Sequence, residues 1–278
     1  TTGDNNVAMG SYAMDANTTG ASNVGIGVHA LGANTTAAGN IAIGEDALKT
    51  CTTSAANQAI GTSALYSVTT GDGGNAVVGH QACYSTTTAH STSALGKYAG
   101  YALTTGTNNT FIGKDAGRTG SPGGNVTTGS NAIYLGDDNV GASHIQTDWT
   151  VASDKRDKTD VEPLKTGLEF INKLEPVTFC WDKRSKYVSK GIDFENITPD
   201  GTHKEDWLDT GFLAQDVEAL EAEYNYNMDD KTNLTTHVSD DGKQYGLTYS
   251  KFVPSLVKAI QELSAEVEAL KQKAHDKC

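Results

Sequence analysis

A large aliphatic residue followed directly by glycine recurs through the first half of the chain at almost constant spacing. Successive glycines are 17 residues apart, except for one step of 18 and a longer final step of 23. An alanine follows three residues after each of the first seven glycines, and an asparagine usually stands four residues before the glycine. Self-similarity at a fixed period is typical of a stacked repeat protein. The repeat glycines are Gly10, Gly27, Gly44, Gly61, Gly79, Gly96, Gly113 and Gly136.

Each repeat predicts one short β-strand. Stretches such as NVGIG (23–27) and NTFIG (109–113) alternate with period two and lie between Asn and Gly, which favour turns. The position two before the glycine is mostly Ala or Gly, which indicates a face that another backbone approaches closely. Because so short a unit cannot bury its own apolar face, it must stack on its neighbours. We therefore predict a β-solenoid over residues 1–139 and a linker over 140–152, with a disordered tract rich in Gly, Thr and Ser as the alternative.

The predicted rod is thin, and its core positions hold small residues. Such a cross-section offers little buried surface to a single chain, so a homotrimer is the expected state. The chain also begins in phase with the repeat, from which we expect it to be part of a longer protein.

Beyond Trp149 the pattern becomes that of a small α+β domain, predicted over residues 153–278. The fold class expected for the whole chain is therefore mainly β, with an α+β C-terminal domain. A helix is expected after Pro163, with Leu164, Leu168, Ile171 and Leu174 on one face, followed by a strand at VTFCWD (177–182). A polar excursion over residues 182–206 and a second helix, with Leu213, Val217 and Leu220 on one face, come next. The chain then forms a hairpin that turns at Asp241-Gly242.

The last predicted element is a long helix, expected to form a coiled coil over about residues 250–275. Its apolar residues are spaced alternately by three and four positions, which is a heptad seam and indicates self-association. β-Branched residues at a and Leu at d favour dimers in isolated peptides, whereas the rest of the chain favours a trimer. The seam comprises Val253, Leu256, Ile260, Leu263, Val267, Leu270 and Ala274.

Charge and composition narrow the functions. The net charge of -13 disfavours nucleic acid, whose phosphates require clustered Lys and Arg. Acids exceed bases in both halves: residues 1–152 hold 4 Lys and Arg against 9 Asp and Glu, and residues 153–278 hold 17 against 25. No apolar run approaches the roughly 20 residues of a membrane span, so no membrane insertion is expected. The 4 Cys and 7 His show no metal-ligand spacing, so we expect reduced thiols, no metal and no cofactor.

The repeat stretches of the type NxAIGxxAL resemble the head repeats of trimeric adhesins and of phage tail fibres. That resemblance covers residues 1 to about 137 and implies a trimeric β-roll. The period in this chain is longer than that of the short adhesin repeat.

Three further blocks resemble the C-terminal intramolecular chaperone of phage tail spikes and fibres, the endosialidase type. They are SDKRDKTDVEPLKTGLEFINKLEPVTFCW, GFLAQDVEAL and YGLTYSKFVPSLVKAIQELSAEVEALK, and together they run from Ser153 to about Lys273. The resemblance implies a domain that trimerises, drives the preceding fibre to trimerise in register, and then cuts itself off. It also implies cleavage at a Ser-Asp bond by a serine paired with a lysine five residues on.

Carried over to this chain, the resemblance makes Ser153 the nucleophile, Lys158 the base and Ser153-Asp154 the scissile bond. A lysine can act as a base once burial lowers its pKa toward neutrality, so burial in an assembled trimer would make cleavage depend on correct assembly. Asp157 departs from the family, whose members carry an apolar residue beside the lysine. A carboxylate there would keep Lys158 charged and slow the cut.

The geometry of attack leaves two routes open. If Ser153 attacked its own carbonyl carbon, a strained four-membered ring would form, whereas attack on the carbonyl of Ala152 would form a five-membered ring. Cleavage after Ser153 therefore requires a serine from a neighbouring chain or a water activated nearby. Taken without the resemblance, SDKRDK (153–158) is typical of a charged, solvated linker.

The function expected is that of a phage tail fibre or spike segment in the virion, with a chaperone part that is released in the host cytoplasm after cleavage. Its enzymatic activity would be at most a single self-cleavage by a Ser-Lys pair. The alternative is a receptor-binding adhesin with an uncleaved trimerisation domain, whose polar surface, including Tyr84, Tyr98 and Tyr101, docks on host-surface glycans. A glycan-cleaving enzyme lacks support, because residues 1–152 offer no convincing pair of catalytic acids.

Overall fold

The computed structural model describes residues 2–188 and 193–276, and the chain forms two compact units. We call them the repeat unit and the α/β unit and describe each by itself. The repeat unit comprises Thr1–Ala142, Lys183–His203 and Ser239–Gln244. The α/β unit comprises Ser143–Asp182, Lys204–Val238 and Tyr245–Cys278.

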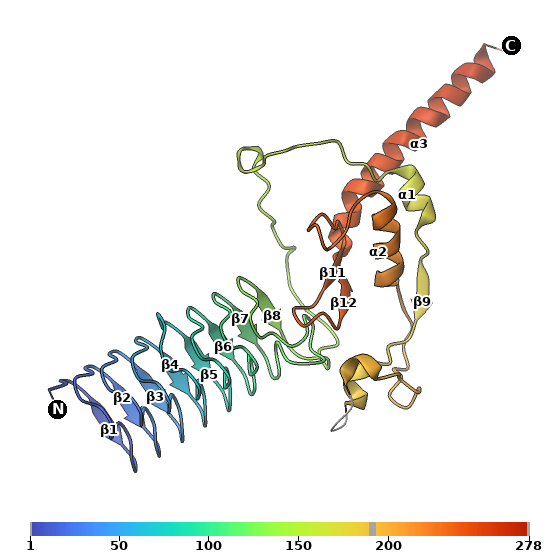
Figure 1. The fold of residues 1–278 in the computed structure, drawn as a ribbon. Coiled ribbons are helices and arrows are strands. Elements are labelled where there is room, and N and C mark those ends of the chain that lie inside the picture. The colour runs from blue at the N-terminus through green and yellow to red at the C-terminus, as the bar shows by residue number, and fades with distance from the viewer. Residues whose placement is uncertain (1, 189–192, 277–278) are drawn as a thin grey trace. The chain divides into compact units, whose positions relative to one another are not determined.

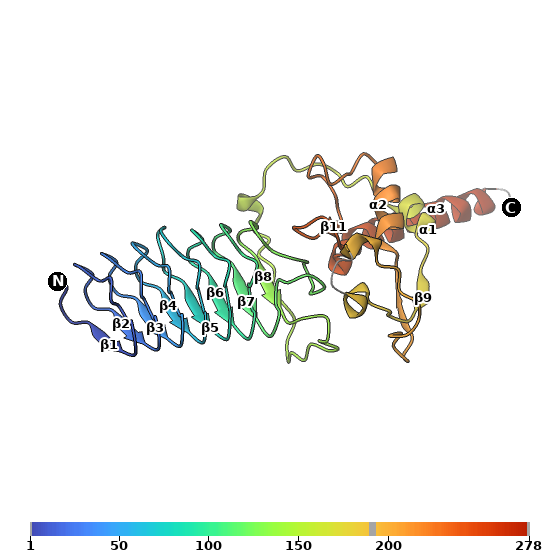
Figure 2. The same cartoon turned by 60° about the horizontal axis from the view of Figure 1, so that its bottom comes forward.

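The repeat unit is a β-solenoid, as the glycine period predicted. One strand from each repeat joins a parallel sheet of eight strands, ordered along the sheet as they are along the chain (Figures 1 and 2). Equivalent positions of neighbouring repeats pair, for example Ile41 with Gln58 and Ile43 with Ile60. The strands are β1 (Val7–Met9), β2 (Val24–Ile26), β3 (Ile41–Ile43), β4 (Gln58–Ile60), β5 (Ala76–Val78), β6 (Ser93–Leu95), β7 (Thr110–Ile112) and β8 (Ile133–Leu135).

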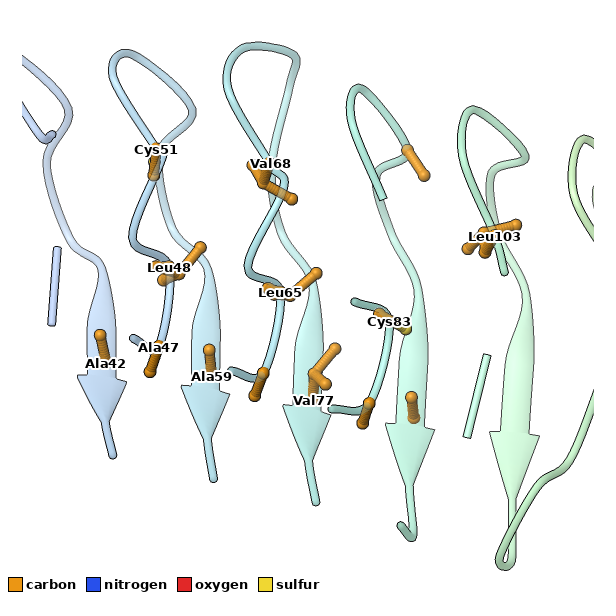
Figure 3. Packing of buried hydrophobic residues seen from close by; sticks show 14 of the residues in the cluster. Ala42, Ala47, Leu48, Cys51, Ala59, Leu65, Val68, Val77, Cys83 and Leu103 are labelled. Atoms are coloured by element: carbon orange, nitrogen blue, oxygen red, sulfur yellow. The ribbon is translucent and has the colours of Figure 1, made fainter. Parts of the chain in front are cut away.

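The middle residue of each strand from β2 to β7 is buried in a narrow core. Ala42, Ala59 and Val77 are fully buried, and the alanine three residues after each glycine, such as Ala47, packs beside them (Figure 3). A fully buried Leu or Cys follows this alanine in four successive coils, as at Leu48. Small side chains are required because the walls of each coil lie close together, as the Ala and Gly two residues before each repeat glycine predicted.

The repeat glycine is required on two grounds, illustrated by Gly44. Its φ of +131° lies in a region that side-chain-bearing residues rarely adopt. A Cβ atom at this position would also lie 2.6 Å from the carbonyl carbon of Gly61 in the next coil. Both the turn after the strand and the stacking of coils therefore depend on glycine here.

A ladder of buried asparagines ties the coils together. The side-chain oxygen of Asn23 accepts the backbone N–H of Asn40 at 2.9 Å, and that of Asn40 accepts the backbone N–H of Asn57 at 2.8 Å. The side-chain amide of Asn40 donates to the carbonyl of Ser54 at 2.9 Å. Each buried amide thus pairs with a backbone group that would otherwise lose its hydrogen bond on burial.

Phe111 replaces the small inward residue near the end of the solenoid. It stacks on Tyr134 with ring centroids 4.9 Å apart. Room for the ring comes from Gly100 and Gly117, where earlier coils carry Leu or Cys. A Cβ at Gly100 would lie 2.9 Å from Cδ2 of Phe111, and one at Gly117 would lie 2.7 Å from Cδ1.

The third residue of every strand points outward and is aliphatic in all eight coils. We call this row the aliphatic ladder. Six of its eight residues are exposed, from Ile60 at 40% to Met9 at 63%, and Ile26 and Ile43 are half-buried. The ladder comprises Met9, Ile26, Ile43, Ile60, Val78, Leu95, Ile112 and Leu135.

Two segments from later in the chain pack on the final coil within the repeat unit. Residues 239–244 place the Asp241 carboxylate where it accepts the backbone N–H of Asn125 at 3.0 Å. Residues 183–203 include η2 (Arg184–Tyr187) and η3 (Phe194–Asn196), and the hydroxyl of Ser185 donates to Asp138 at 2.6 Å. These polar contacts cover the open end of the stack, which a solenoid must cap. Residues 189–192 of the predicted excursion lie outside the described residues.

The α/β unit is built around a small cluster of Phe170, Val217, Leu220 and Phe252. Its antiparallel strand pairs are β9 with β10 and β11 with β12. The elements are η1 (Lys155–Asp157), α1 (Leu168–Lys173), β9 (Val177–Phe179), β10 (Asp209–Gly211), α2 (Ala214–Glu223), β11 (Thr236–Val238), β12 (Tyr245–Leu247), η4 (Tyr249–Lys251) and α3 (Phe252–His275).

Helix α1 begins later than its apolar spacing predicted. Gly167 precedes it in a non-helical conformation, with φ -139° and ψ -138°, so Leu164 lies outside the helix. The segment before α1 is held by α3 instead: Thr166 bonds Ser255 at 2.7 Å, and Lys258 donates to the carbonyl of Leu164. Tertiary hydrogen bonds therefore displaced the predicted first turn.

One face of helix α3 packs within the α/β unit, and another face is exposed to solvent. Ser255 and Ala259 are buried toward α1, and the carboxylate of Glu262 accepts the N–H of Leu168 at 2.7 Å. The predicted heptad seam lies on other faces of the helix and is exposed, with Ile260 67% exposed and Leu270 64% exposed. The long C-terminal helix predicted from the heptads is confirmed.

Glu221 anchors the β11–β12 hairpin to α2. This carboxylate is 1% exposed and accepts hydrogen bonds from the N–H groups of Leu234 and Thr235 and the hydroxyls of Thr235 and Thr236, at 2.5 to 3.2 Å. Four donors compensate the desolvation of a buried charge.

Cys51, Cys83 and Cys180 are free thiols, and Cys278 lies outside the described residues. Burial raises the pKa of Cys51 to about 11 and that of Cys83 to about 12, so neither is a reactive thiolate at neutral pH. None of the described helices is both long enough and apolar enough to span a membrane.

Candidate active site

A single turn of 3-10 helix brings the two predicted site residues together. Asp154 caps the N-terminus of η1, and the chain leaves the turn at Lys158. The Nζ atom of Lys158 lies 2.6 Å from Oγ of Ser153 and 3.4 Å from the carbonyl oxygen of the same residue. The lysine thus contacts both the hydroxyl and the carbonyl of the bond predicted to be cut.

Asp154, on the other side of that bond, is held by Arg156. Its Oδ1 accepts the backbone N–H of Arg156 at 2.9 Å, and its two oxygens accept Nε and Nη2 of the guanidinium at 2.6 to 3.2 Å. These hydrogen bonds lower the pKa of the Asp154 carboxyl and raise that of Arg156. Arg156 was not predicted from the sequence, because residues two positions apart meet only where the backbone turns.

The arrangement can support proton transfer from serine to lysine. An ammonium group at this position donates to the hydroxyl, whereas a neutral amine at the same distance accepts the hydroxyl proton. Ser153 and Lys158 are exposed in the single chain, so water surrounds the pair. Lysine acts as a base where water is excluded, and burial of this pair would have to come from contacts beyond those within one chain.

The other acids named from the sequence lie in the same segment. Asp157 belongs to η1, where its N–H donates to the carbonyl of Asp154 at 3.2 Å, and Asp160 follows in a left-handed conformation with φ +50°. Both are exposed. Across residues 2–188 and 193–276, no three or more His, Cys, Asp and Glu side chains are arranged to hold a metal ion.

The fold and the site define a class of protein: a solenoid rod with an unpaired apolar ladder, followed by a small α/β domain that begins with a Ser-Lys pair. Residues 153–224 match the family described as chaperone of endosialidase. The first two sequence blocks lie within this match, and the third lies beyond it. Comparisons with curated proteins and with solved structures gave no match. The family points to a phage tail fibre or tail spike, a virion component, with an intramolecular chaperone.

Proposed function

We propose that this chain is a segment of a trimeric phage tail fibre or spike whose C-terminal domain drives trimerisation and then releases itself by cutting Ser153-Asp154. The observation that carries the proposal is the 2.6 Å contact between Lys158 Nζ and Ser153 Oγ at the first residue of the family match. In this proposal residues 1–139 are the rod, 140–152 the linker and 153–278 the chaperone, which leaves the virion for the host cytoplasm once cut.

The aliphatic ladder supports self-association of the rod. It places one apolar side chain per coil on the surface, from Met9 to Leu135, in a row that a soluble monomer would expose to water. A partner that covers the row must repeat at the same spacing along the whole sheet. Another copy of the same solenoid, aligned coil by coil, meets this requirement.

Helix α3 supports the same association in a parallel arrangement. Val257, at an e position, is 48% exposed and widens the apolar face beyond the a and d residues, which favours a bundle over a two-stranded coil. In a parallel arrangement, Glu266 at g faces Lys271 at e of the neighbouring chain, an attractive pair. The wider apolar face thus supports three parallel chains. The β-branched residues at a, with Leu at d, would by themselves favour dimers.

The proposed reaction is one hydrolysis per chain. Lys158 accepts the proton of the Ser153 hydroxyl, and the serine oxygen adds to the carbonyl carbon of Ser153 in a neighbouring chain. The proton passes to the nitrogen of Asp154 as the C–N bond breaks, and water then hydrolyses the ester that remains, which restores the serine hydroxyl. Net addition of one water leaves a carboxylate on Ser153 and a new amino terminus on Asp154. Trimer contacts would exclude water from the pair, so that cutting follows assembly.

Denaturing electrophoresis of freshly expressed protein tests the cut. Wild type is expected to give two fragments, with the smaller one beginning at Asp154 by N-terminal sequencing. Ser153→Ala and Lys158→Ala should each give one intact band, while the matched controls Ser143→Ala and Lys155→Ala should cleave as wild type does. An intact wild-type chain in the assembled protein would contradict self-cleavage.

A second candidate function, glycan binding, is favoured by a cluster of tyrosines on the repeat unit. Tyr66, Tyr84 and Tyr101 stack in sequence with centroids 4.9 and 5.4 Å apart, and Arg118 lies 4.8 Å from the ring centroid of Tyr98. Because the stacked rings cover one another's faces, a ligand would meet their edges and hydroxyl groups. The chemistry fits an anionic, hydroxyl-rich glycan.

Glycan-array binding of the assembled rod tests this second function. Wild type is expected to retain anionic glycans, and Lys97→Ala, which removes the ammonium 4.9 Å from the Tyr98 ring centroid, should weaken that binding. Lys49→Ala, which removes a cation 5.7 Å from the Tyr66 ring centroid, tests whether the other end of the row also contributes. Absence of any retained glycan would leave the structural role alone.

A further inference from the structure

We propose that Arg156 is a positioning residue for the cleavage, acting through Asp154 to hold Lys158 on Ser153. We call the Arg156–Asp154 pair the clamp. This inference rests on the proposed self-cleavage and adds a residue that neither the Ser-Lys pair nor the scissile bond includes.

The clamp closes the loop between the two site residues. Five residues of extended chain would separate Ser153 from Lys158 by roughly 17 Å, whereas a lysine side chain reaches only about 6 Å. The loop folds back because Asp154 accepts both the backbone N–H and the guanidinium of Arg156. Two further backbone bonds complete the turn, from the N–H of Asp157 to the Asp154 carbonyl at 3.2 Å and from that of Lys158 to the Lys155 carbonyl at 3.3 Å.

The clamp also neutralises the carboxylate closest in sequence to the reacting atoms. Both oxygens of Asp154 are engaged by Arg156, so this acid is paired with a guanidinium. Without Arg156 the freed carboxylate would attract the ammonium of Lys158 and stabilise its protonated form. Loss of Arg156 would therefore both loosen the loop and disfavour the neutral amine that the reaction needs.

The side chains of the clamp exchange no proton and form no bond with the reacting atoms, although the backbone nitrogen of Asp154 belongs to the scissile bond. Its effect must appear as a change in the rate and pH dependence of a reaction that Ser153 and Lys158 carry out. Arg suits the role better than Lys because its planar group bonds both carboxylate oxygens at once.

A time course of cleavage in assembled protein, followed across pH, tests the clamp. We expect Arg156→Gln to slow cleavage at least tenfold and to move the pH profile upward, whereas Lys155→Gln in the same turn should stay within twofold of wild type. Arg156→Lys should recover part of the rate. If Arg156 acts through Asp154, the double variant Arg156→Gln/Asp154→Asn should be no slower than the slower of the two single variants.

If Arg156→Gln is cut with the rate and pH profile of wild type while Ser153→Ala stays uncut, the role of the clamp is overturned and self-cleavage is supported. An uncut wild type would instead count against self-cleavage, and the clamp is then judged by amide hydrogen exchange in the Ser153→Ala protein. There Arg156→Gln should speed exchange of the Asp157 and Lys158 amides relative to Lys155→Gln. Equal exchange in these two variants would overturn the clamp.

Discussion

Gly44 shows how much a single residue contributes to the stack. We expect Gly44→Ala to lower the free energy of unfolding by about 1–3 kcal/mol from backbone strain alone, with a further cost from the contact against Gly61. Urea unfolding followed by circular dichroism, at one fixed protein concentration, measures the change.

Gly74→Ala is the control for that substitution. Gly74 also has a positive φ, +69°, but a Cβ there would have no atom within 4 Å. Its cost should be limited to the left-handed conformation, about 1 kcal/mol. Equal destabilisation by the two substitutions would show that coil-to-coil contact is unimportant at Gly44.

Asp157 is the residue that the family resemblance led us to expect would slow self-cleavage. Removing its negative charge removes an attraction for the ammonium form of the neighbouring Lys158, so Asp157→Asn is expected to speed self-cleavage by about three- to tenfold. The gain should be largest at low pH, where the neutral amine is scarcest. Asp148→Asn, an equal charge change ten residues before Lys158, should leave the rate unchanged, and an effect of the same size there would attribute the change to net charge.

The catalytic roles of Ser153 and Lys158 stay a prediction, but the contact between these two side chains could be expected from the sequence, whereas the residues that support it could not. The Ser153–Lys158 spacing and the family resemblance pointed to a pair that the structure places in contact. The contact between Arg156 and Asp154 could not be predicted, because it depends on the turn of the backbone at Asp154. The role of Gly100 and Gly117 could not be predicted for a similar reason, since they make room for the side chain of Phe111, which belongs to another part of the coil.

At the scale of elements, period-two alternation predicted both the strands and their crowded face. The residues two before the repeat glycines are mostly Ala or Gly, and they point inward as Ala42 and Ala59 do. Helical periodicity was less reliable for α1, whose predicted first turn at Leu164 is absent. The segment around Leu164 instead forms hydrogen bonds with residues of α3 that lie about 90 positions further along the chain. Contacts at such a separation leave no signal in the local sequence.

The aliphatic ladder leads to a prediction at this scale. The double variant Ile60→Glu/Val78→Glu adds two charges per chain to neighbouring rungs of the ladder, where three chains would bring them together out of water. We expect it to shift the protein from trimer to smaller species in sedimentation velocity. Thr105→Glu, at an exposed position outside the strands, should remain trimeric, and a trimeric double variant would place the interface elsewhere.

At the scale of the whole molecule, each compact unit contains segments that are not contiguous in the chain. The repeat period predicts the solenoid from local sequence, because every coil repeats the same pattern. Contacts such as that between Asn125 and Asp241, 116 residues apart, occur once and follow no period. The inclusion of residues 183–203 and 239–244 in the repeat unit therefore became visible only in the structure.

Assembly also bears on which chain supplies the nucleophile. The hydroxyl of Ser153 cannot easily reach its own carbonyl carbon, because the ring formed would have four members. We therefore expect attack across chains of the trimer. Co-expression of wild type with a Ser153→Ala chain carrying a distinguishing tag should give mixed trimers in which the tagged chain is cut on the amino side of Asp154, detected by mass spectrometry, whereas trimers of the tagged chain alone stay intact. A tagged chain that remains whole beside cut wild-type chains would contradict attack across chains and assign the nucleophile to a water held by each chain's own Ser153 and Lys158.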